Sequence, residues 1–142
     1  VAPDSETIAL LIAAAMDSII WGGNNFNLPQ SRCWFVWDKG TSVPTLSDVE
    51  LAWTSMSKPS KRFRHSRDHY DYKHPTQKPI ALMLWCLSHV PEARTVLDPF
   101  MGSGTTLVAC KRNHLQATGI EKEERYCEIS AKRLSQKVLA FA

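Results

Sequence analysis

The run DPFMGSGTT, from Asp98 to Thr106, places Gly102 and Gly104 on either side of Ser103, directly after a short apolar segment. Glycines between a strand and a helix let the backbone approach a ligand closely, and the helix that follows offers free N–H groups. Glu121 lies 17 positions after Gly104. That spacing is close to the roughly 20 expected of a carboxylate that binds both hydroxyls of a ribose. These residue types and spacings predict a site for a ligand that contains a nucleoside.

Three ligand classes compete for this site. A phosphate-binding P-loop requires GxxxxGK[ST], and no lysine follows Gly104. An NAD site requires GxGxxG, but the position three after Gly104 is Leu107. S-adenosylmethionine carries no phosphate, so it requires the turn and the acid without the full fingerprint. The strand, the turn and the acid together disfavour the remaining alternative, an ordinary turn with an incidental glutamate.

The residues around the turn alternate between helix and strand patterns. Strands are expected at residues 95–97 and 117–120, with a helix between them that ends near Arg112 and stops at a left-handed Asn113. A helix before this unit has Thr76 as its cap and Pro79 in its first turn. Its apolar face carries Ile80, Met83, Leu84 and Leu87, and the last helix of the chain carries Cys127, Ala131, Leu134 and Val138 on one face. This alternation predicts an α/β fold with a parallel sheet.

The first half of the chain shows shorter signals. A helix opens at Pro3 and Asp4 and places Ile8, Leu11, Ile12 and Ala15 at helical spacing. Strands are expected at residues 18–21, 33–37 and 49–53, the last two as neighbours, with a turn over residues 22–25. Trp34 and Trp37 lie three apart in one strand and therefore point to opposite faces, so core packing explains at least one of them. Residues 57–73 lack an apolar period and are expected to form a mobile loop.

Several of these segments resemble the β group of DNA N6-adenine and N4-cytosine methyltransferases, especially its phage-type members. VLDPFMGSGTT, residues 96–106, looks like motif I of that group, and HPTQKP, residues 74–79, looks like motif X. Motif X precedes motif I only in circularly permuted members. Further similar segments are IIWGGNNF at 19–26, WFVWDK at 34–39, LAWTS at 51–55 and TGIEKEERYCEIS at 118–130. The resemblance covers nearly the whole chain and implies a Rossmann-like methyltransferase sheet with S-adenosylmethionine as cofactor.

The resemblance also implies roles for individual residues. Contacts to the methionine and sulfonium part of the cofactor fall on the motif I segment, and Glu121 would hold the ribose. The motif X residues would close over the carboxylate end of the cofactor, although Lys78 also fits a solvated lysine at a helix start. The complete set of implied cofactor residues is Asp98, Pro99, Phe100, Gly102, Ser103, Gly104, Thr105, Glu121, Thr76, Gln77 and Lys78.

The family's catalytic motif is DPPY or a variant that begins with Asp, Asn or Ser. It binds the amine of a flipped base through an acceptor side chain and a proline carbonyl, while its aromatic ring stacks on the base. In the family it precedes the strand that residues 19–26 resemble, and residues 1–18 contain no such tetrad. The resemblance therefore predicts one partial domain over residues 1–142, a sheet incomplete on its N-terminal side and unassigned catalytic residues. The chain begins with Val1, so we expect a trimmed or truncated protein that requires a complementary N-terminal segment or subunit for turnover.

The segment 57–73 combines basic and aromatic residues. Its candidate phosphate contacts are Lys58, Lys61, Arg62, Arg64 and Arg67, and Phe63 and Tyr70 could stack on bases. A solvated basic loop is the alternative. The family resemblance favours contact with double-stranded DNA, because this segment lies where part of the target-recognition region would lie.

Bulk composition is ordinary for one soluble domain. The 142 residues are 44% hydrophobic and 22% charged, with a net charge of +3. The four cysteines are never closer than 17 positions and the histidines lack ligand spacing, so no metal site is expected. No apolar run approaches the roughly 18 residues of a membrane span. We expect free thiols in a reducing cytoplasm, and the resemblance implies a bacterial or phage-infected cell, in a phage or restriction-modification setting.

Two functions of different classes stay open. The first is a site-specific DNA methyltransferase that transfers a methyl group from S-adenosylmethionine to N6 of adenine or N4 of cytosine. The second is a catalytically inactive remnant or subunit that binds S-adenosylmethionine, DNA or both. A dinucleotide-dependent enzyme is disfavoured by the missing third glycine.

Overall fold

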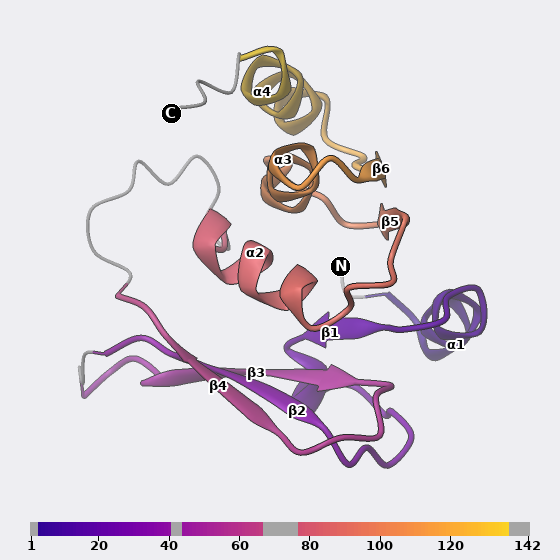
Figure 1. Ribbon diagram of the computed structural model, residues 1–142, viewed down its shortest axis with the longest axis vertical. Coiled ribbons are helices and arrows are strands. Elements are labelled where there is room, and N and C mark those ends of the chain that lie inside the picture. Colours follow the sequence, from indigo (N-terminus) through magenta and orange to yellow (C-terminus); the bar gives the residue numbers. More distant parts are fainter. Residues whose placement is uncertain (1–2, 41–43, 67–76, 137–142) are drawn as a thin grey trace. The chain divides into compact units, whose positions relative to one another are not determined.

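The computed structural model describes residues 3–40, 44–66 and 77–136 of the chain. These residues separate into two compact units, Val1–Arg67 and Asp68–Ala142. Each unit is mixed α/β and contains its own sheet (Figure 1). The expectation of one partial domain stays a prediction. Among the residues named in the sequence analysis, Arg67, Tyr70, Thr76 and Val138 lie outside the described residues.

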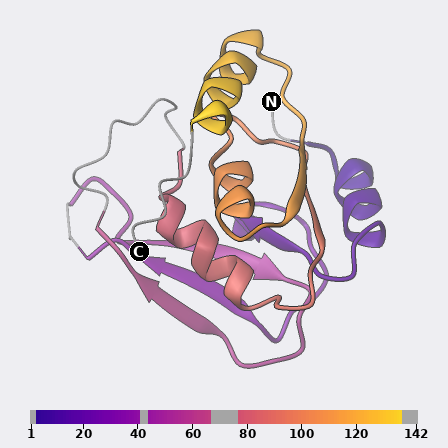
Figure 2. The ribbon, with the colours of Figure 1, turned by 45° about the horizontal axis from the view of Figure 1, so that its top comes forward.

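The first unit consists of helix α1 (Ser5–Ala13), a 3-10 turn η1 (Gly23–Asn25) and four strands. The strands are β1 (Ile19–Trp21), β2 (Trp34–Asp38), β3 (Val49–Thr54) and β4 (Lys61–Arg64), in the sheet order β1-β3-β2-β4. β3 is antiparallel to β1 and to β2, whereas β4 is parallel to β2, as the arrows in Figure 2 show. The expected pairing of the second and third strands is confirmed.

Alternation along β2 produces the core of this unit. Phe35 and Trp37 are buried while Trp34 and Val36 are half-buried, which confirms that the two tryptophans of this strand differ in environment. Polar atoms in the core are paired. Trp37 Nε1 donates to the His65 carbonyl at 2.8 Å, and the hydroxyl of the fully buried Thr54 donates to the Cys33 carbonyl at 2.7 Å.

The start of the first unit partly follows the predicted pattern. Asp4 accepts a hydrogen bond from Thr7 N at 2.7 Å and caps α1, which ends at Ala13. Ile8 is the buried residue of this helix, whereas Ala15, expected on the same face, follows the helix and is exposed. The predicted turn over residues 22–25 is confirmed, with Gly22 at a φ of 73°.

The prediction of a loop throughout residues 57–73 was wrong for residues 61–64, which form β4. The reason is that β4 is an edge strand with the sequence KRFR and buries little side-chain surface. Its backbone hydrogen bonds to β2 hold it in place. Sequence periodicity detects buried side chains, not backbone pairing, so a strand of this kind gives no apolar signal.

The second unit alternates helix and strand, as predicted. Its elements are α2 (Ile80–Ser88), β5 (Thr95–Asp98), α3 (Thr105–Arg112), β6 (Gln116–Gly119) and α4 (Glu124–Ser135). β5 and β6 are parallel, and α3 connects them. α3 packs on both strands and also contacts α2 and α4. The central β5–α3–β6 unit therefore delivers the end of β5, the start of α3 and the end of β6 to one edge of the sheet.

The helices of the second unit depart from the predictions in detail. Pro79 is the N-cap of α2 and not a first-turn residue, and Leu82 and Cys86 are buried beside Met83 and Leu87. On α4 the buried residues are Tyr126 and Ser130, whereas Ala131 is exposed. Ser130 is buried because it packs against Gly104 of the loop before α3.

The end of α3 was also predicted incorrectly. Asn113 has a φ of −96°, and the left-handed residue is His114 at 56°. The His114 N–H donates to the Lys111 carbonyl at 3.2 Å, and the Leu115 N–H donates to the Cys110 carbonyl at 2.9 Å. These two bonds form a Schellman motif that places the left-handed residue one position later than expected.

Candidate functional site

The loop from Asp98 to Thr105 is tied to the end of β6. The backbone N–H of Ile120 donates to the Asp98 carbonyl at 2.9 Å, and the Met101 N–H donates to the Ile120 carbonyl at 3.0 Å. Asp98 Oδ1 accepts from the Phe100 N–H at 3.1 Å, which closes a turn around Pro99. These bonds extend the β5–β6 pairing beyond the strands and give the first half of the loop a fixed course.

Two glycines of this loop adopt left-handed conformations. Gly102 has a φ of 51° and Gly104 a φ of 76°, and Gly104 is the N-cap of α3. A Cβ added to Gly104 would lie 2.1 Å from Ser130 Oγ and 2.9 Å from Ser130 Cβ. The position therefore requires glycine for two independent reasons, the backbone conformation and the close approach of α4.

Glu121 follows β6 and faces the loop with its carboxylate. Oε2 accepts from the Gly102 N–H at 3.1 Å, and Oε1 accepts from the Glu123 N–H at 2.9 Å. The two bonds fix the orientation of the carboxylate, and each oxygen retains further acceptor capacity. A fixed pair of acceptors beside a glycine turn is suited to the two hydroxyls of a ribose.

The second half of the loop is held by side chains from α4 and from the residue three before α2. Ser103 Oγ donates to Gln77 Oε1 at 2.8 Å. Arg133 Nη1 donates to the Ser103 carbonyl at 2.7 Å, to Ser103 Oγ at 3.0 Å and to Thr105 Oγ1 at 3.1 Å. The structure therefore joins residues 77, 103, 105 and 133 in one hydrogen-bonded network.

Apolar side chains stand exposed around the loop. Phe100 is 57% exposed and Ile120 is 55% exposed; Phe100 precedes Met101 in the chain, and the Ile120 carbonyl accepts from the Met101 N–H. Large apolar residues left in water beside paired acceptors are typical of a ligand site. The donor and acceptor set fits a cofactor with an aromatic base, a ribose and an amino acid part.

Most of the cofactor residues predicted from the sequence come together here. Asp98, Pro99, Phe100, Gly102, Ser103, Gly104 and Thr105 form the loop, Glu121 bonds to Gly102, and Gln77 bonds to Ser103. Lys78 follows Gln77 two positions before α2. Sequence reasoning missed Arg133 and Ser130. A basic residue in the last turn of a helix is explained by the helix dipole alone, so nothing in the sequence set Arg133 apart.

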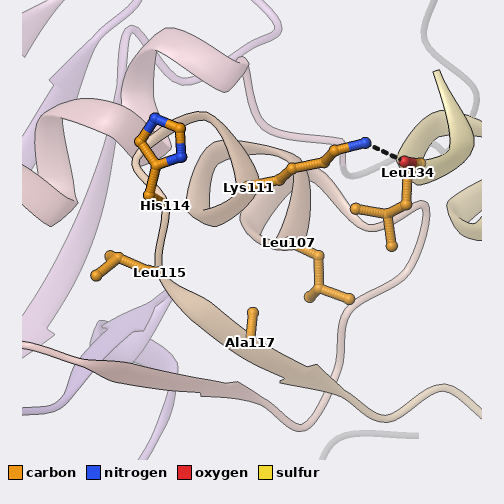
Figure 3. A pocket seen from close by; sticks show the side chains of 6 residues that line it. All are labelled: Leu107, Lys111, His114, Leu115, Ala117 and Leu134. Atoms are coloured by element: carbon orange, nitrogen blue, oxygen red, sulfur yellow. Dashed lines mark hydrogen bonds between the residues drawn. The ribbon is translucent and has the colours of Figure 1, made fainter. Parts of the chain in front are cut away.

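The second unit contains a hollow of about 380 Å³ (Figure 3). It is lined by Leu107, Lys111, His114, Leu115, Ala117 and Leu134, and Lys111 Nζ donates to the Leu134 carbonyl. No predicted cofactor residue is among its lining residues. This hollow is therefore lined by residues other than those predicted to bind the cofactor.

Four of the five predicted DNA-contact residues lie among the described residues of the first unit. Lys61, Arg62 and Arg64 are exposed on β4, and Lys58 is half-buried just before it. Arg62 and Arg64 share a face of the strand, and each lies 4.0 Å from the same Asp38 oxygen. Their side chains are 73% and 72% exposed. An exposed pair at this distance interacts weakly with its carboxylate, so both guanidinium groups stay available for other anions.

Residues 3–40, 44–66 and 77–136 contain no group of three or more His, Cys, Asp or Glu side chains arranged to hold a metal ion. The four cysteines are free thiols. In the described part of the chain, no helix has the length and hydropathy to cross a membrane.

A family model described as "DNA methylase", covering the N6 and N4 enzymes, matches residues 17–132. The chain belongs to this DNA methylase family. It is 33% identical over 122 residues to the type II methyltransferase M2.LlaDCHI of Lactococcus lactis subsp. cremoris, covering 84% of this chain and 42% of that protein. It is 32% identical over 120 residues to M2.DpnII of Streptococcus pneumoniae, covering 83% and 41%.

Solved structures agree with this family. The crystal structure of the M1.HpyAVI–SAM complex matches with a TM-score of 0.60 and 28% identity, over 92% of this chain and 70% of that one. The cytosine-N4-specific PvuII DNA methyltransferase shares the fold at a TM-score of 0.57, with 18% identity over 75% of this chain and 52% of that one. The chain spans about two fifths of the length of the curated relatives it matches. The Rossmann-like α/β class expected from the sequence is confirmed.

Proposed function

We propose that this DNA methylase chain binds S-adenosylmethionine on the Asp98–Thr105 loop and serves methyl transfer to an exocyclic amine of adenine or cytosine in DNA. The observation that carries the proposal is the fixed Glu121 carboxylate, bonded to the Gly102 N–H at 3.1 Å beside two left-handed glycines. Glu121 would take the ribose hydroxyls, and the loop would take the methionine part. The cofactor supplies an electrophilic methyl group when bound.

The chain's own residues orient that ligand. The acceptors of Glu121 and Asp98 lie at the ends of adjacent parallel strands, and both are anchored by backbone N–H groups. Anchored acceptors require little reorganisation on binding, which favours affinity and a single ligand orientation. The exposed ring of Phe100 would lose water-accessible surface against the ligand.

Calorimetry of the full chain with S-adenosylmethionine and with NAD tests this proposal. We expect S-adenosylmethionine to bind and NAD to give no heat. Phe100→Ala should weaken binding at least about tenfold, because about 1.5–3 kcal/mol accompanies burial of a large apolar side chain. Leu97→Ala is the matched control, since Leu97 is 49% exposed on β5 and is not among the predicted cofactor residues. Binding of NAD in place of S-adenosylmethionine would overturn the proposal.

Turnover is a separate question from binding. Residues 1–18 lack the DPPY-type tetrad, so the group that accepts the target amine would come from a complementary segment or subunit. We therefore expect cofactor binding without methylation when the purified chain is mixed with duplex DNA and labelled cofactor. Robust incorporation of label would contradict this division of roles and require an amine acceptor within the chain.

The basic side chains of β4 provide the proposed DNA contact. Arg62 and Arg64 lie on one face of an exposed edge strand, where phosphate contacts would release counterions. Reversing both charges to Glu should weaken duplex DNA binding at least about tenfold and reduce the slope of log affinity against log salt by about 2. The control reverses the exposed Lys122 and Lys132, which changes the net charge by the same amount. Equal losses from both double variants would show that only net charge matters.

A further inference from the structure

The half-buried side chain of Arg133, on α4, forms hydrogen bonds to the Asp98–Thr105 loop. Its Nη1 atom donates to the Ser103 carbonyl at 2.7 Å, to Ser103 Oγ at 3.0 Å and to Thr105 Oγ1 at 3.1 Å. Ser103 and Thr105 are only 3% and 7% exposed. One nitrogen thus bonds to the residues on both sides of Gly104, the point at which the loop turns into α3.

Ser130, one helical turn before Arg133, packs against the same point. A Cβ on Gly104 would lie 2.1 Å from Ser130 Oγ, and Ser130 is 2% exposed. Residues three apart in a helix lie on one face. This face of α4 therefore covers the turn with two side chains, one that limits space and one that donates hydrogen bonds.

The hydroxyl of Ser103 links Arg133 to the segment before α2. It donates its hydrogen to Gln77 Oε1 at 2.8 Å, so it is available as an acceptor for the guanidinium. Gln77 is itself one of the residues implied in cofactor binding. A change at Arg133 would thus be transmitted to the loop and, through Ser103, to Gln77 before α2.

Arg133 carries its charge at a position that disfavours a cation. Burial lowers the pKa of its guanidinium, and the nearby Arg112 lowers that pKa further. A guanidinium nevertheless stays charged in proteins, and hydrogen bonds from a charged donor are stronger than neutral ones. Partial burial and the nearby Arg112 both raise the free-energy cost of the charge on Arg133. The three hydrogen bonds to the loop offset that cost.

We propose that Arg133 is a positioning residue that holds Ser103 to Thr105 in the conformation that receives the methionine part of S-adenosylmethionine. This inference rests on the proposed function of the loop. Arg133 does not need to touch the ligand for this role. It acts by reducing the number of conformations that the loop adopts before binding, and preorganisation of this kind raises affinity.

The test compares two ligands, of which only one carries the amino acid part that the loop would receive. S-adenosylmethionine and 5′-deoxy-5′-methylthioadenosine share adenine, ribose and an S-methyl group, but the second lacks the amino acid part and the positive charge on sulfur. For Arg133→Ala in the full chain, we expect S-adenosylmethionine to bind about tenfold more weakly or worse, since bonds to a charged group are lost. Methylthioadenosine should bind within about threefold of its affinity for the unaltered chain.

Added guanidinium ion at low millimolar concentration should restore part of the lost affinity in Arg133→Ala only. Lys132→Ala is the matched control, because Lys132 precedes Arg133 in the same helical turn, carries the same charge and is exposed. It should bind both ligands as the unaltered chain does. An equal loss for both ligands, or no loss for S-adenosylmethionine, would overturn the positioning role.

Amide hydrogen exchange in the ligand-free chain separates this inference from the proposed function. The Gly104 N–H donates to the Met101 carbonyl at 2.8 Å. In Arg133→Ala this amide should exchange about tenfold faster or more, whereas Lys132→Ala should leave it unchanged. If the unaltered chain failed to bind S-adenosylmethionine, the proposed function would be wrong. The exchange result would still decide whether Arg133 positions the loop.

Discussion

Gly104→Ala is the substitution whose effect the structure defines most sharply. The added methyl group meets two separate penalties. A φ of 76° costs an alanine about 1–2 kcal/mol relative to glycine. The Cβ would also lie 2.1 Å from Ser130 Oγ and 2.9 Å from Ser130 Cβ, and overpacking of this kind costs about 1–3 kcal/mol. We expect the free energy of unfolding to fall by about 2–5 kcal/mol in total.

A double-mutant cycle with Ser130→Gly separates the two penalties. Once the Ser130 side chain is removed, the contact that remains with this residue is its Cα, which lies 3.4 Å from the new Cβ. The steric penalty should therefore disappear, while the backbone penalty remains. In the Ser130→Gly background, Gly104→Ala should cost only about 1–2 kcal/mol, the backbone penalty alone. Ser130→Gly by itself should cost about 1 kcal/mol, as expected for glycine within a helix.

Urea unfolding of the full chain, followed by far-ultraviolet circular dichroism, measures these differences. Gly22→Ala provides an internal control, because Gly22 has a similar φ of 73° but its nearest neighbour to an added Cβ is Asn25 Nδ2 at 3.6 Å. That variant should show the backbone penalty alone. If Gly104→Ala cost the same with and without the Ser130 side chain, the close approach of α4 would not be the reason for the glycine.

Two further predictions concern buried side chains. Thr54→Val should lower the free energy of unfolding by about 1–3 kcal/mol, because the Cys33 carbonyl loses the shorter of its two hydroxyl donors, at 2.7 Å, and the Met56 N–H loses its acceptor at 3.3 Å. Thr54→Ser retains the hydroxyl and should cost less in the same urea titration, so equal losses would contradict the hydrogen-bond argument. Burial, with a smaller effect from Asp98, raises the pKa of the Cys110 thiol to about 11 from 9.0. Folding therefore favours the neutral thiol, and the stability advantage over Cys110→Ala should be complete below pH 9 and shrink as the pH rises toward 11. A constant advantage from pH 8 to 11 would show that the thiol is not shifted.

The fold was predictable wherever apolar side chains follow a regular period. β2 alternates buried and half-buried residues, and the apolar face of α2 includes Met83 and Leu87 as expected. β4 was missed because its four residues are held by backbone pairing at a sheet edge. The stop of α3 was displaced by one residue because its last turn closes through His114.

In the candidate site, too, some residues were predictable from the sequence and others were not. The glycine turn and Glu121 were predictable because each answers a local requirement, a left-handed backbone or an acceptor at a strand end. Arg133 and Ser130 were not, because their roles exist only once α4 packs against the loop. Residues that act through tertiary contacts carry no sequence pattern of their own.

The two edge strands of the sheet in the first unit differ in charge, and this difference affects how readily the sheet could grow into a fibre. The β4 border carries Lys61, Arg62 and Arg64, and like charges resist the addition of another strand. The β1 border is the uncharged run Ile19–Trp21. Growth of the sheet through the β4 border would bring these like charges together, which opposes a fibre built by strand addition at that border.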